Sequence, residues 1–480
     1  MARKRQSIGH VPPQENSDMF SLLPESLLLI IVSFLPFKEA ARTCILSKRW
    51  LELWKSTKNV EFNELFFVNL DESDSVKESQ RRVFLNFVTR WIQDYKDHVV
   101  DKFSLKVSLP ENCRGTIERC VAFATQRGVK ELGLDFSDPK WEENNFDDRD
   151  ALFQLPKHVY RHGSLESLKL YSCSFVMPDL LNFRTLKDVS LGWIEVNIST
   201  LKTLLSTCKM IENLSLKKCW NLANFDLGEE KLGLRRLVID KCHFENDYFI
   251  FKAPNLKFLK YSGVVGIFDI DLCPHVMEEA DIDFALESDL DESGNDLGND
   301  LCKVLVDLYP VRVLTVCSFV LQAVHSGDEP LRVQCDLNVR HLIMKTQMHP
   351  YELCGFMFLL NSCPMLETLT LEIGLRNIFS EYTLPYPINL EKFWEHPRVP
   401  SKCLKRTLKV VEVNGFRGSM NEFLACAYFI QAGTVLEKIN INVLKEEDAN
   451  SDKKVEMLLG MARFLEKVPK ASRNLQISIA

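Results

Sequence analysis

The acidic segment 289–300, DLDESGNDLGND, has the carboxylate spacing in this chain that comes nearest to a metal-binding loop. Asp289, Asp291 and Ser293 fall on positions one, three and five of an EF-hand calcium loop. Position twelve is Asp300, where such loops use a longer, bidentate glutamate. Because that ligand is short and no amphipathic helix clearly precedes the loop, we expect an acidic, mobile insertion rather than a calcium site.

Other catalytic and metal-binding patterns are incomplete. HVYRH places His158 and His162 four residues apart, but Val159 stands where a zinc protease would need its glutamate. The sequence has no GxSxG, no phosphate-binding GxxxxGK and no GxGxxG. We therefore expect a non-catalytic protein with no metal and no cofactor.

The composition is that of a globular chain with a large core: 480 residues, 46% hydrophobic and 26% charged. The net charge of 59 − 66 = −7 does not indicate a nucleic-acid partner. The 15 cysteines are an odd number and include no CxxC pair. This usage predicts reduced thiols, and hence a cytoplasmic and/or nuclear protein.

The most apolar stretch is LPESLLLIIVSFLP, residues 23–36. Pro24 suits the first turn of a helix, and Pro36 ends the helix by restricting Leu35. About ten helical residues span about 15 Å, half of a roughly 30 Å bilayer core. We therefore expect neither export nor a membrane anchor.

The same stretch is too apolar for an ordinary surface helix. On a helical wheel, more than half of the circumference is covered by Leu27, Leu28, Ile30, Ile31, Val32, Phe34 and Leu35. Two more short helices are predicted after it. Ala40, Ala41, Cys44 and Ile45 line the first, and Trp50, Leu51 and Trp54 fill the inner face of the second. Such a small helical unit needs cover, from the rest of the chain or from another protein.

The segment 18–54 resembles the F-box motif in its plant form (LPxxLLxxIxSxLPxKEA, then LSKRW and LW). The resemblance implies binding to a Skp-type adaptor, and through it to a cullin–RING ubiquitin ligase. By motif position, it assigns five residues to the adaptor interface: Leu23, Pro24, Leu27, Ile31 and Leu35. It also implies that Leu46 and Trp50 join this interface or back it.

The middle of the chain repeats. LESLKLYSC (165–173), IENLSLKKC (211–219) and LRRLVIDKC (234–242) share one apolar frame, which recurs from residue 129 to residue 436. Leu201, Leu204, Leu205 and Cys208 are spaced as one face of a helix that leads into such a strand. We therefore predict stacked units of helix, turn and parallel strand. Three cysteines that end the frame are expected to be buried and unreactive: Cys173, Cys219 and Cys242.

This pattern resembles an irregular leucine-rich-repeat array, and residues 394–441 resemble the FBD domain of plant F-box/LRR proteins. The predicted fold class is α/β, with a short all-α F-box before a leucine-rich-repeat solenoid and a C-terminal FBD cap. The predicted domains are a tail (1–17), the F-box (18–57), a helical linker (58–99), the solenoid (100–392) and the FBD domain with the cap (393–480).

The two resemblances together imply the substrate-recognition subunit of an SCF-type ubiquitin ligase, holding an unknown target protein by its repeats. No nucleic-acid or membrane partner is expected. Trp193 and Trp220, which follow repeat strands, are candidate rim residues for target contact. The alternative is a ligand-binding or scaffold protein that uses the solenoid without assembling a ligase.

Overall fold

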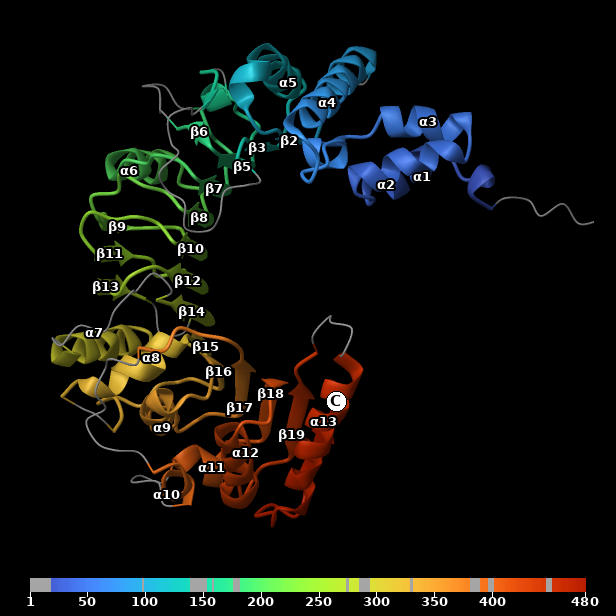
Figure 1. Ribbon diagram of the computed structural model, residues 1–480. Helices are drawn as coiled ribbons and strands as arrows, with labels where there is room; N and C mark the ends of the chain where they lie inside the picture. The colour runs from blue at the N-terminus through green and yellow to red at the C-terminus, as the bar shows by residue number, and fades with distance from the viewer. Residues whose placement is uncertain are drawn as a thin grey trace, which may run out of the picture. The chain divides into compact units, whose positions relative to one another are not determined.

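The computed structural model describes residues 19–96, 99–138, 153–157, 159–175, 182–272, 276–284, 294–328, 331–379, 389–395, 401–445 and 451–480. The chain divides into two compact units, Met1–Leu134 (unit 1) and Asp135–Ala480 (unit 2). Figure 1 labels most of the helices and strands of both units.

Unit 1 begins with the short helices that the sequence predicts. They are η1 (Met19–Leu22), α1 (Glu25–Ser33), α2 (Phe37–Arg42), η2 (Thr43–Ile45) and α3 (Lys48–Lys55). Pro24 directly precedes α1, and Pro36, with φ −52° and ψ 143°, separates α1 from α2. Ser47 takes the N-cap position of α3, but its side chain makes no capping hydrogen bond.

The rest of unit 1 alternates strands and helices. It contains β1 (Asn59–Asn63), η3 (Glu64–Phe66), α4 (Asp74–Asp94), β2 (Lys102–Lys106), η4 (Pro110–Cys113), α5 (Arg114–Gln126) and β3 (Glu131–Asp135). The sheet order is β1-β2-β3, and β1 runs parallel to β2. The predicted helical linker, 58–99, contains the long helix α4 but starts with a strand, because Val60 and Phe62 alternate into the core.

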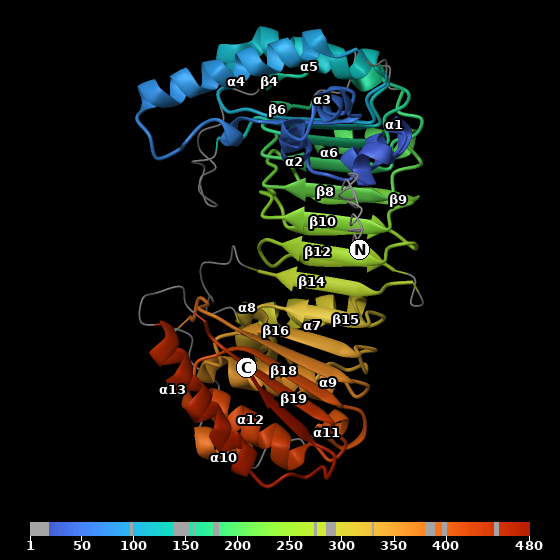
Figure 2. The same ribbon diagram turned by 90° about the vertical axis from the view of Figure 1, so that its right-hand side faces the viewer.

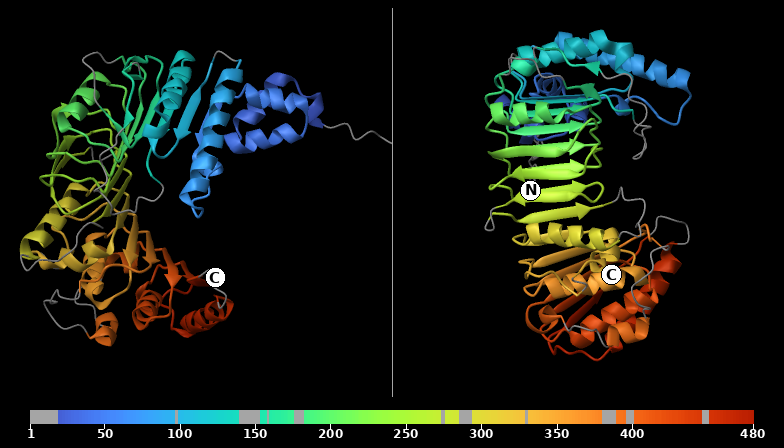
Figure 3. Two further views of the ribbon diagram at one scale, coloured as in Figure 1. Left: turned by 45° about the horizontal axis from the view of Figure 1, so that its top comes forward. Right: turned by 90° about the vertical axis from the view of Figure 1, so that its left-hand side faces the viewer.

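An aromatic cluster joins the short helices to α4 and β1. Phe37 of α2 lies 5.6 Å from Phe62 of β1 and 5.6 Å from Trp91 of α4, between ring centroids. Trp54 of α3 lies 5.7 Å from Phe37 and 6.3 Å from Trp91. Figure 3 (left) shows α4 beside the short helices. The F-box segment is therefore part of the core of unit 1 rather than a module on a free tether.

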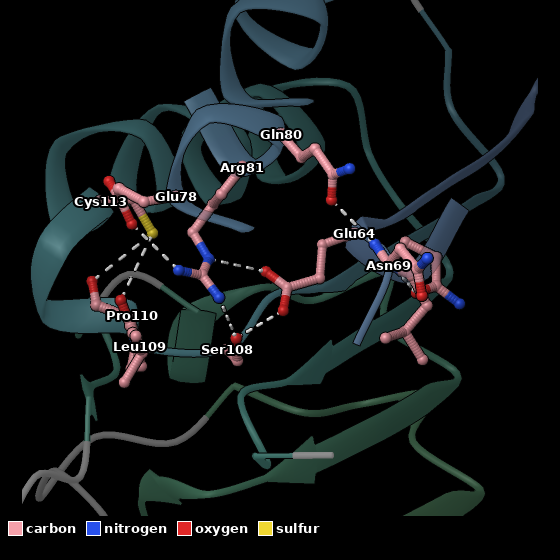
Figure 4. A network of polar contacts seen from close by, with 11 residues as sticks. Glu64, Asn69, Glu78, Gln80, Arg81, Ser108, Leu109, Pro110 and Cys113 are labelled. Atoms are coloured by element: carbon pink, nitrogen blue, oxygen red, sulfur yellow. Dashed lines mark hydrogen bonds and ion pairs between the residues drawn. The ribbon is translucent and has the colours of Figure 1, made fainter. Parts of the chain in front are cut away.

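A buried ionic network holds α4 to η3 and to the segment after β2 (Figure 4). Arg81 Nε lies 3.4 Å from Glu64 Oε2, and its Nη2 donates to Ser108 Oγ at 2.9 Å. Ser108 Oγ donates in turn to Glu64 Oε1 at 2.5 Å. All three residues are buried, so removing the Arg81 guanidinium would leave the buried Glu64 carboxylate without its ionic partner.

Unit 2 is built on twelve parallel strands that pair with their neighbours in chain order (Figures 1 and 2). They are β5 (Ser167–Tyr171), β7 (Asp188–Gly192), β8 (Asn213–Lys217), β10 (Arg236–Asp240), β12 (Phe258–Ser262), β14 (Glu279–Asp283), β15 (Val313–Val316), β16 (His341–Thr346), β17 (Thr368–Ile373), β18 (Val410–Phe416), β19 (Lys438–Val443) and β20 (Gln476–Ile479).

The predicted repeat frame sets the strand register. The pairings align the first apolar strand position of five successive repeats, and all five residues are buried: Leu168, Val189, Leu214, Leu237 and Leu259. Because side chains alternate along a strand, the intervening positions lie on the opposite, open face. The predicted stack of parallel strands is confirmed.

Helices cover one face of this sheet, as Figure 1 shows for α6, α7, α9 and α12. The helices of unit 2 are α6 (Ile198–Thr207), α7 (Gly294–Asp307), α8 (Ser318–Ala323), α9 (Leu353–Ser362), α10 (Leu390–Glu395), α11 (Lys402–Arg406), α12 (Met420–Ala432) and α13 (Ser451–Arg463). The smaller elements are β4 (Phe153–Gln154), η5 (Val159–Arg161), β6 (Cys173–Ser174), η6 (Val324–Ser326), η7 (Pro350–Glu352) and η8 (Phe464–Lys467). The predicted apolar face of α6 is buried.

Three consecutive repeats depart from the predicted helix-turn-strand unit. Between β8 and β14 the covering layer is a second parallel sheet, made of β9 (Phe225–Lys231), β11 (Tyr248–Lys252) and β13 (Ile267–Asp271). Sequences such as YFIFK are rich in aromatic and β-branched residues, which favour a strand over a helix. Phe249 and Phe268 stack at 4.7 Å inside this layer.

Residues 393–480, predicted as the FBD domain and the C-terminal cap, contribute β18, β19 and β20 to the same sheet. Gly415 and Gly418 have φ of 79° and 74°, so the chain can turn from β18 into α12. Ser419 caps α12 by accepting a hydrogen bond from the Glu422 amide at 3.3 Å. The segment therefore continues the stack to its last strand.

Candidate protein-binding site

Helix α1 leaves one apolar side uncovered. Leu27, Ile30 and Phe34 are 46%, 50% and 82% exposed, whereas Leu28 and Val32 are 0% and 1% exposed. The two groups lie on different sides of the helical wheel. We call Leu27, Ile30 and Phe34 the α1 face.

The covered side of α1 is held by the other short helices. Arg49 Nη2 of α3 donates to the Leu23 carbonyl at 2.6 Å, and Phe20 packs edge-on against Trp50 with centroids 6.2 Å apart. Asn59 Nδ2 donates to the Ser33 carbonyl at 2.9 Å, which holds the end of α1 beside β1. The α1 face is thus presented by a fixed helix.

A second exposed apolar group lies at the end of η2. Ile45 and Leu46 are 89% and 63% exposed, and Phe20 and Leu22 in η1 are also exposed. The expectation that Ile45 lines an inner helix face was wrong, because the helix changes to a 3₁₀ turn at Thr43 and points Ile45 outward. Large exposed apolar residues in a segment this short mark a protein-interaction surface.

The seven residues assigned by the F-box resemblance fall into three classes. Pro24, Leu27 and Leu46 are exposed, and Leu23, Ile31 and Leu35 are half-buried. Trp50 is buried and backs the surface. Their assignment to an adaptor interface stays a prediction.

The sequence assignment omitted exposed residues of the same surface: Phe20, Leu22, Ile30, Phe34 and Ile45. The wheel spacing contains a signal for two of them, because Ile30 and Phe34 lie within about 60° of Leu27.

The open face of the unit 2 sheet carries a charged network across β12, β14 and β16. Lys345 Nζ lies 3.0 Å from Asp281 Oδ1 and 3.5 Å from Asp283 Oδ2. Burial opposes the charged form of Lys345, but the hydrogen bond to Asp281 and the charges of both aspartates outweigh it and raise the Lys345 pKa. Asp281 also lies 3.8 Å from Lys260 Nζ.

Beside this network, a hollow of about 250 Å³ lies at the carboxyl ends of the strands. Phe319 and Phe379 form part of its wall, with centroids 5.5 Å apart, and Arg376 and Lys345 line it. The buried Gln322 side chain fixes the loop by donating to the Asn377 carbonyl and accepting from the Phe379 amide, both at 3.0 Å.

The candidate rim residues and the frame cysteines are placed as follows. Trp193 is half-buried and has the Lys218 ammonium 4.3 Å from its ring centroid, and Trp220 is also half-buried. Cys173, Cys219 and Cys242 are buried, as predicted. Burial raises the pKa of the Cys173 and Cys219 thiols, which makes them poor nucleophiles.

The two metal-like patterns do not form a site in the described residues. Residues 285–293 and His158 lie outside these residues, and His162 Nε2 lies 3.1 Å from Ser164 Oγ. Gly294–Asp300 form the first part of α7, so the expectation of a mobile insertion was wrong for this half of the acidic segment. Within the described ranges, no three histidine, cysteine, aspartate or glutamate side chains gather as metal ligands. None of the described helices is long and apolar enough to span a bilayer.

Comparison with known proteins bears on both units. Residues 20–62 match the F-box domain, and residues 94–479 match the At1g61320/AtMIF1 LRR domain. The chain is 34% identical to the putative F-box protein At3g29830 of Arabidopsis thaliana, over 88% of this chain and 91% of the relative. It is 34% identical to the putative F-box/LRR-repeat protein At5g54820 of the same plant, over 89% and 91%. Identity to the F-box/FBD/LRR-repeat protein At5g22660 is 26%, over 89% and 90%.

Proposed function

Since the chain belongs to the F-box/LRR-repeat family, we propose that it is the substrate-recognition subunit of an SCF-type ubiquitin ligase. In this proposal unit 1 binds a Skp-type adaptor, and unit 2 holds a target protein. The adaptor links the complex to a cullin–RING ligase. The ubiquitin transfer itself belongs to the other subunits, and this chain contributes proximity by raising the effective concentration of the target.

The observation that carries the proposal is the α1 face. Three large apolar side chains stand exposed on a helix whose other side is anchored in the core. Burying them on a partner stabilises the complex by about 25 cal/mol for each Å² of apolar surface removed from water. The exposed Ile45 and Leu46 extend the apolar surface that a partner can use.

Target binding is supported by the open face of unit 2. The Lys345–Asp281–Asp283 network offers both charge signs, and the adjoining hollow offers aromatic walls on a loop fixed by Gln322. A pre-organised surface of this kind loses little entropy on binding. We place the protein in the cytoplasm or nucleus, where thiols that are free in the structure, such as Cys173 and Cys219, stay reduced.

The adaptor half is tested by Ile30→Asp, measured as the dissociation constant for a purified Skp-type adaptor. A carboxylate placed in an apolar interface has no partner, so we expect the affinity to fall on the order of a hundredfold. Ile31→Asp, at a half-buried position of the predicted interface, should also weaken binding.

The matched control is Leu375→Asp, which makes the same kind of change at an exposed apolar residue of unit 2. It should leave adaptor binding unchanged. If Ile30→Asp binds the adaptor as the parent does, the α1 face is not the interface. If the parent itself does not bind, the scaffold or ligand-binding alternative is preferred.

A further inference from the structure

Unit 1 contains a hollow of about 410 Å³ lined by residues of α3 and of the second half of α4. Val83, Phe87, Arg90 and Trp91 recur at helical spacing, so they share one side of α4. Trp54 of α3 forms part of the wall. The volume lies in the range of small-molecule sites, which are mostly apolar with a few polar groups.

The wall of this hollow is rigid. The ring of Trp91 lies 4.9 Å from that of Tyr95 and 5.4 Å from that of Phe62, between centroids. The Tyr95 hydroxyl lies 3.1 Å from the Thr57 carbonyl oxygen and 3.0 Å from that of Val99. Val83, in contrast, is 58% exposed, although it sits among aromatic residues. The hollow is therefore preformed, with apolar surface left open to solvent.

The charges around the hollow favour an anion. Lys55 and Arg90 line it, against Asp94 as the single acidic lining residue. Lys55 Nζ lies 3.5 Å from Glu52 Oε1, an exposed pair that contributes little. Arg90 is exposed and forms no ion pair with any residue that the structure describes. Its guanidinium can bind a carboxylate through two parallel hydrogen bonds.

We propose that this hollow binds a small amphipathic carboxylate, with its apolar body against Trp54 and Phe87 and its head group at Arg90. Its lining includes neither the α1 face nor any of the seven residues assigned to the adaptor interface, so we expect ligand binding to leave adaptor binding unchanged. Bound there, the ligand would contact both α3 and α4, and it would stabilise unit 1 by mass action.

The test is isothermal titration calorimetry of the full-length protein with octanoate and, in parallel, with octan-1-ol. We expect octanoate to bind at one site, with an affinity at least about tenfold above that of the alcohol. Arg90→Gln should weaken octanoate binding about tenfold and leave octan-1-ol binding unchanged. Val83→Trp, which fills the hollow, should abolish both.

The control is Phe34→Asp, at the exposed α1 face, which should bind octanoate as the parent does. All three substituted side chains are exposed, so circular dichroism should show unchanged folding. The proposal is overturned if octanoate fails to bind at about 1 mM, if the alcohol binds equally well, or if Val83→Trp has no effect. It is also overturned if Val83→Trp blocks adaptor capture and octanoate does not bind, because the hollow is then a protein contact.

Discussion

Two helices of similar apolar composition differ in how much of their surface is buried in this protein. Helix α9, LCGFMFLLNS, buries nine of its ten residues inside unit 2, whereas α1, ESLLLIIVS, buries only Leu28 and Val32. Helix α9 packs against α8, α11, η6 and η7. Its Gly355 lies so close to the Leu321 backbone that a Cβ would clash with it.

The difference lies in how much of each apolar helix the neighbouring elements cover. A helix that is apolar all round is stable in water only when neighbours cover it. The repeats on either side supply the cover for α9, because stacked units bury their apolar faces on one another. For α1 the described residues cover one side only, and the α1 face stays exposed, which is why we propose it as the adaptor-binding surface.

The largest effect is expected from charging the buried helix. Phe356, 1% exposed in α9, changed to Asp should lower the free energy of unfolding by about 4 kcal/mol or more, since it leaves a cavity and a buried charge. Ile30→Asp on α1 should change it by no more than about 0.5 kcal/mol. Thermal unfolding of both variants measures the contrast. Equal losses would mean that α1 is as much a core helix as α9.

A truncation tests whether the F-box is separable from the rest of unit 1. Removing residues 1–57 takes Phe37 and Trp54 away from Phe62 and Trp91. We expect amide hydrogen exchange in residues 58–134 to accelerate about tenfold or more, while the strands from β5 to β20 stay protected. Unchanged protection of residues 58–134 would support the predicted domain boundary at residue 57.

Low pH should lower the folding stability of unit 2, because His325 is buried in its uncharged form. Burial lowers its pKa to about 4, below the ordinary value of 6.5. Between these values the unfolded chain binds a proton that the folded chain does not, so stability is lost as the pH falls from 6.5 toward 4. The loss should reach about 2 kcal/mol at pH 5. Urea unfolding at pH 7.5 and pH 5 should show it in the parent and not in His325→Met.

A small effect is expected from Trp91→Phe in the aromatic cluster. Its Nε1 is buried with no hydrogen-bond partner among the described residues. Trp91→Phe keeps a ring in place and removes that donor, so the free energy of unfolding should change by less than about 1 kcal/mol. Trp91→Ala, which empties the site, should cost about 3–5 kcal/mol. A large loss for the phenylalanine variant would mean that the indole N–H is satisfied in solution.

The sequence by itself determined the repeat phase and the position of the short helices. Leu168, Leu214 and Leu237 fall in register because alternation along a strand is a local property. Pro24 and Pro36 delimit α1 because proline restricts the backbone wherever it stands. The buried frame cysteines follow from the same phase.

Only the tertiary structure decided which apolar residues stay exposed. Eight apolar residues lie in α1 and directly after it, and the sequence does not distinguish them until Leu28 and Val32 pack into unit 1 and leave Ile30 and Phe34 exposed. The burial of Trp91 between α2, α3 and β1 was also not predictable from spacing. In each case the outcome depends on residues distant in the sequence, which meet only when the chain is folded.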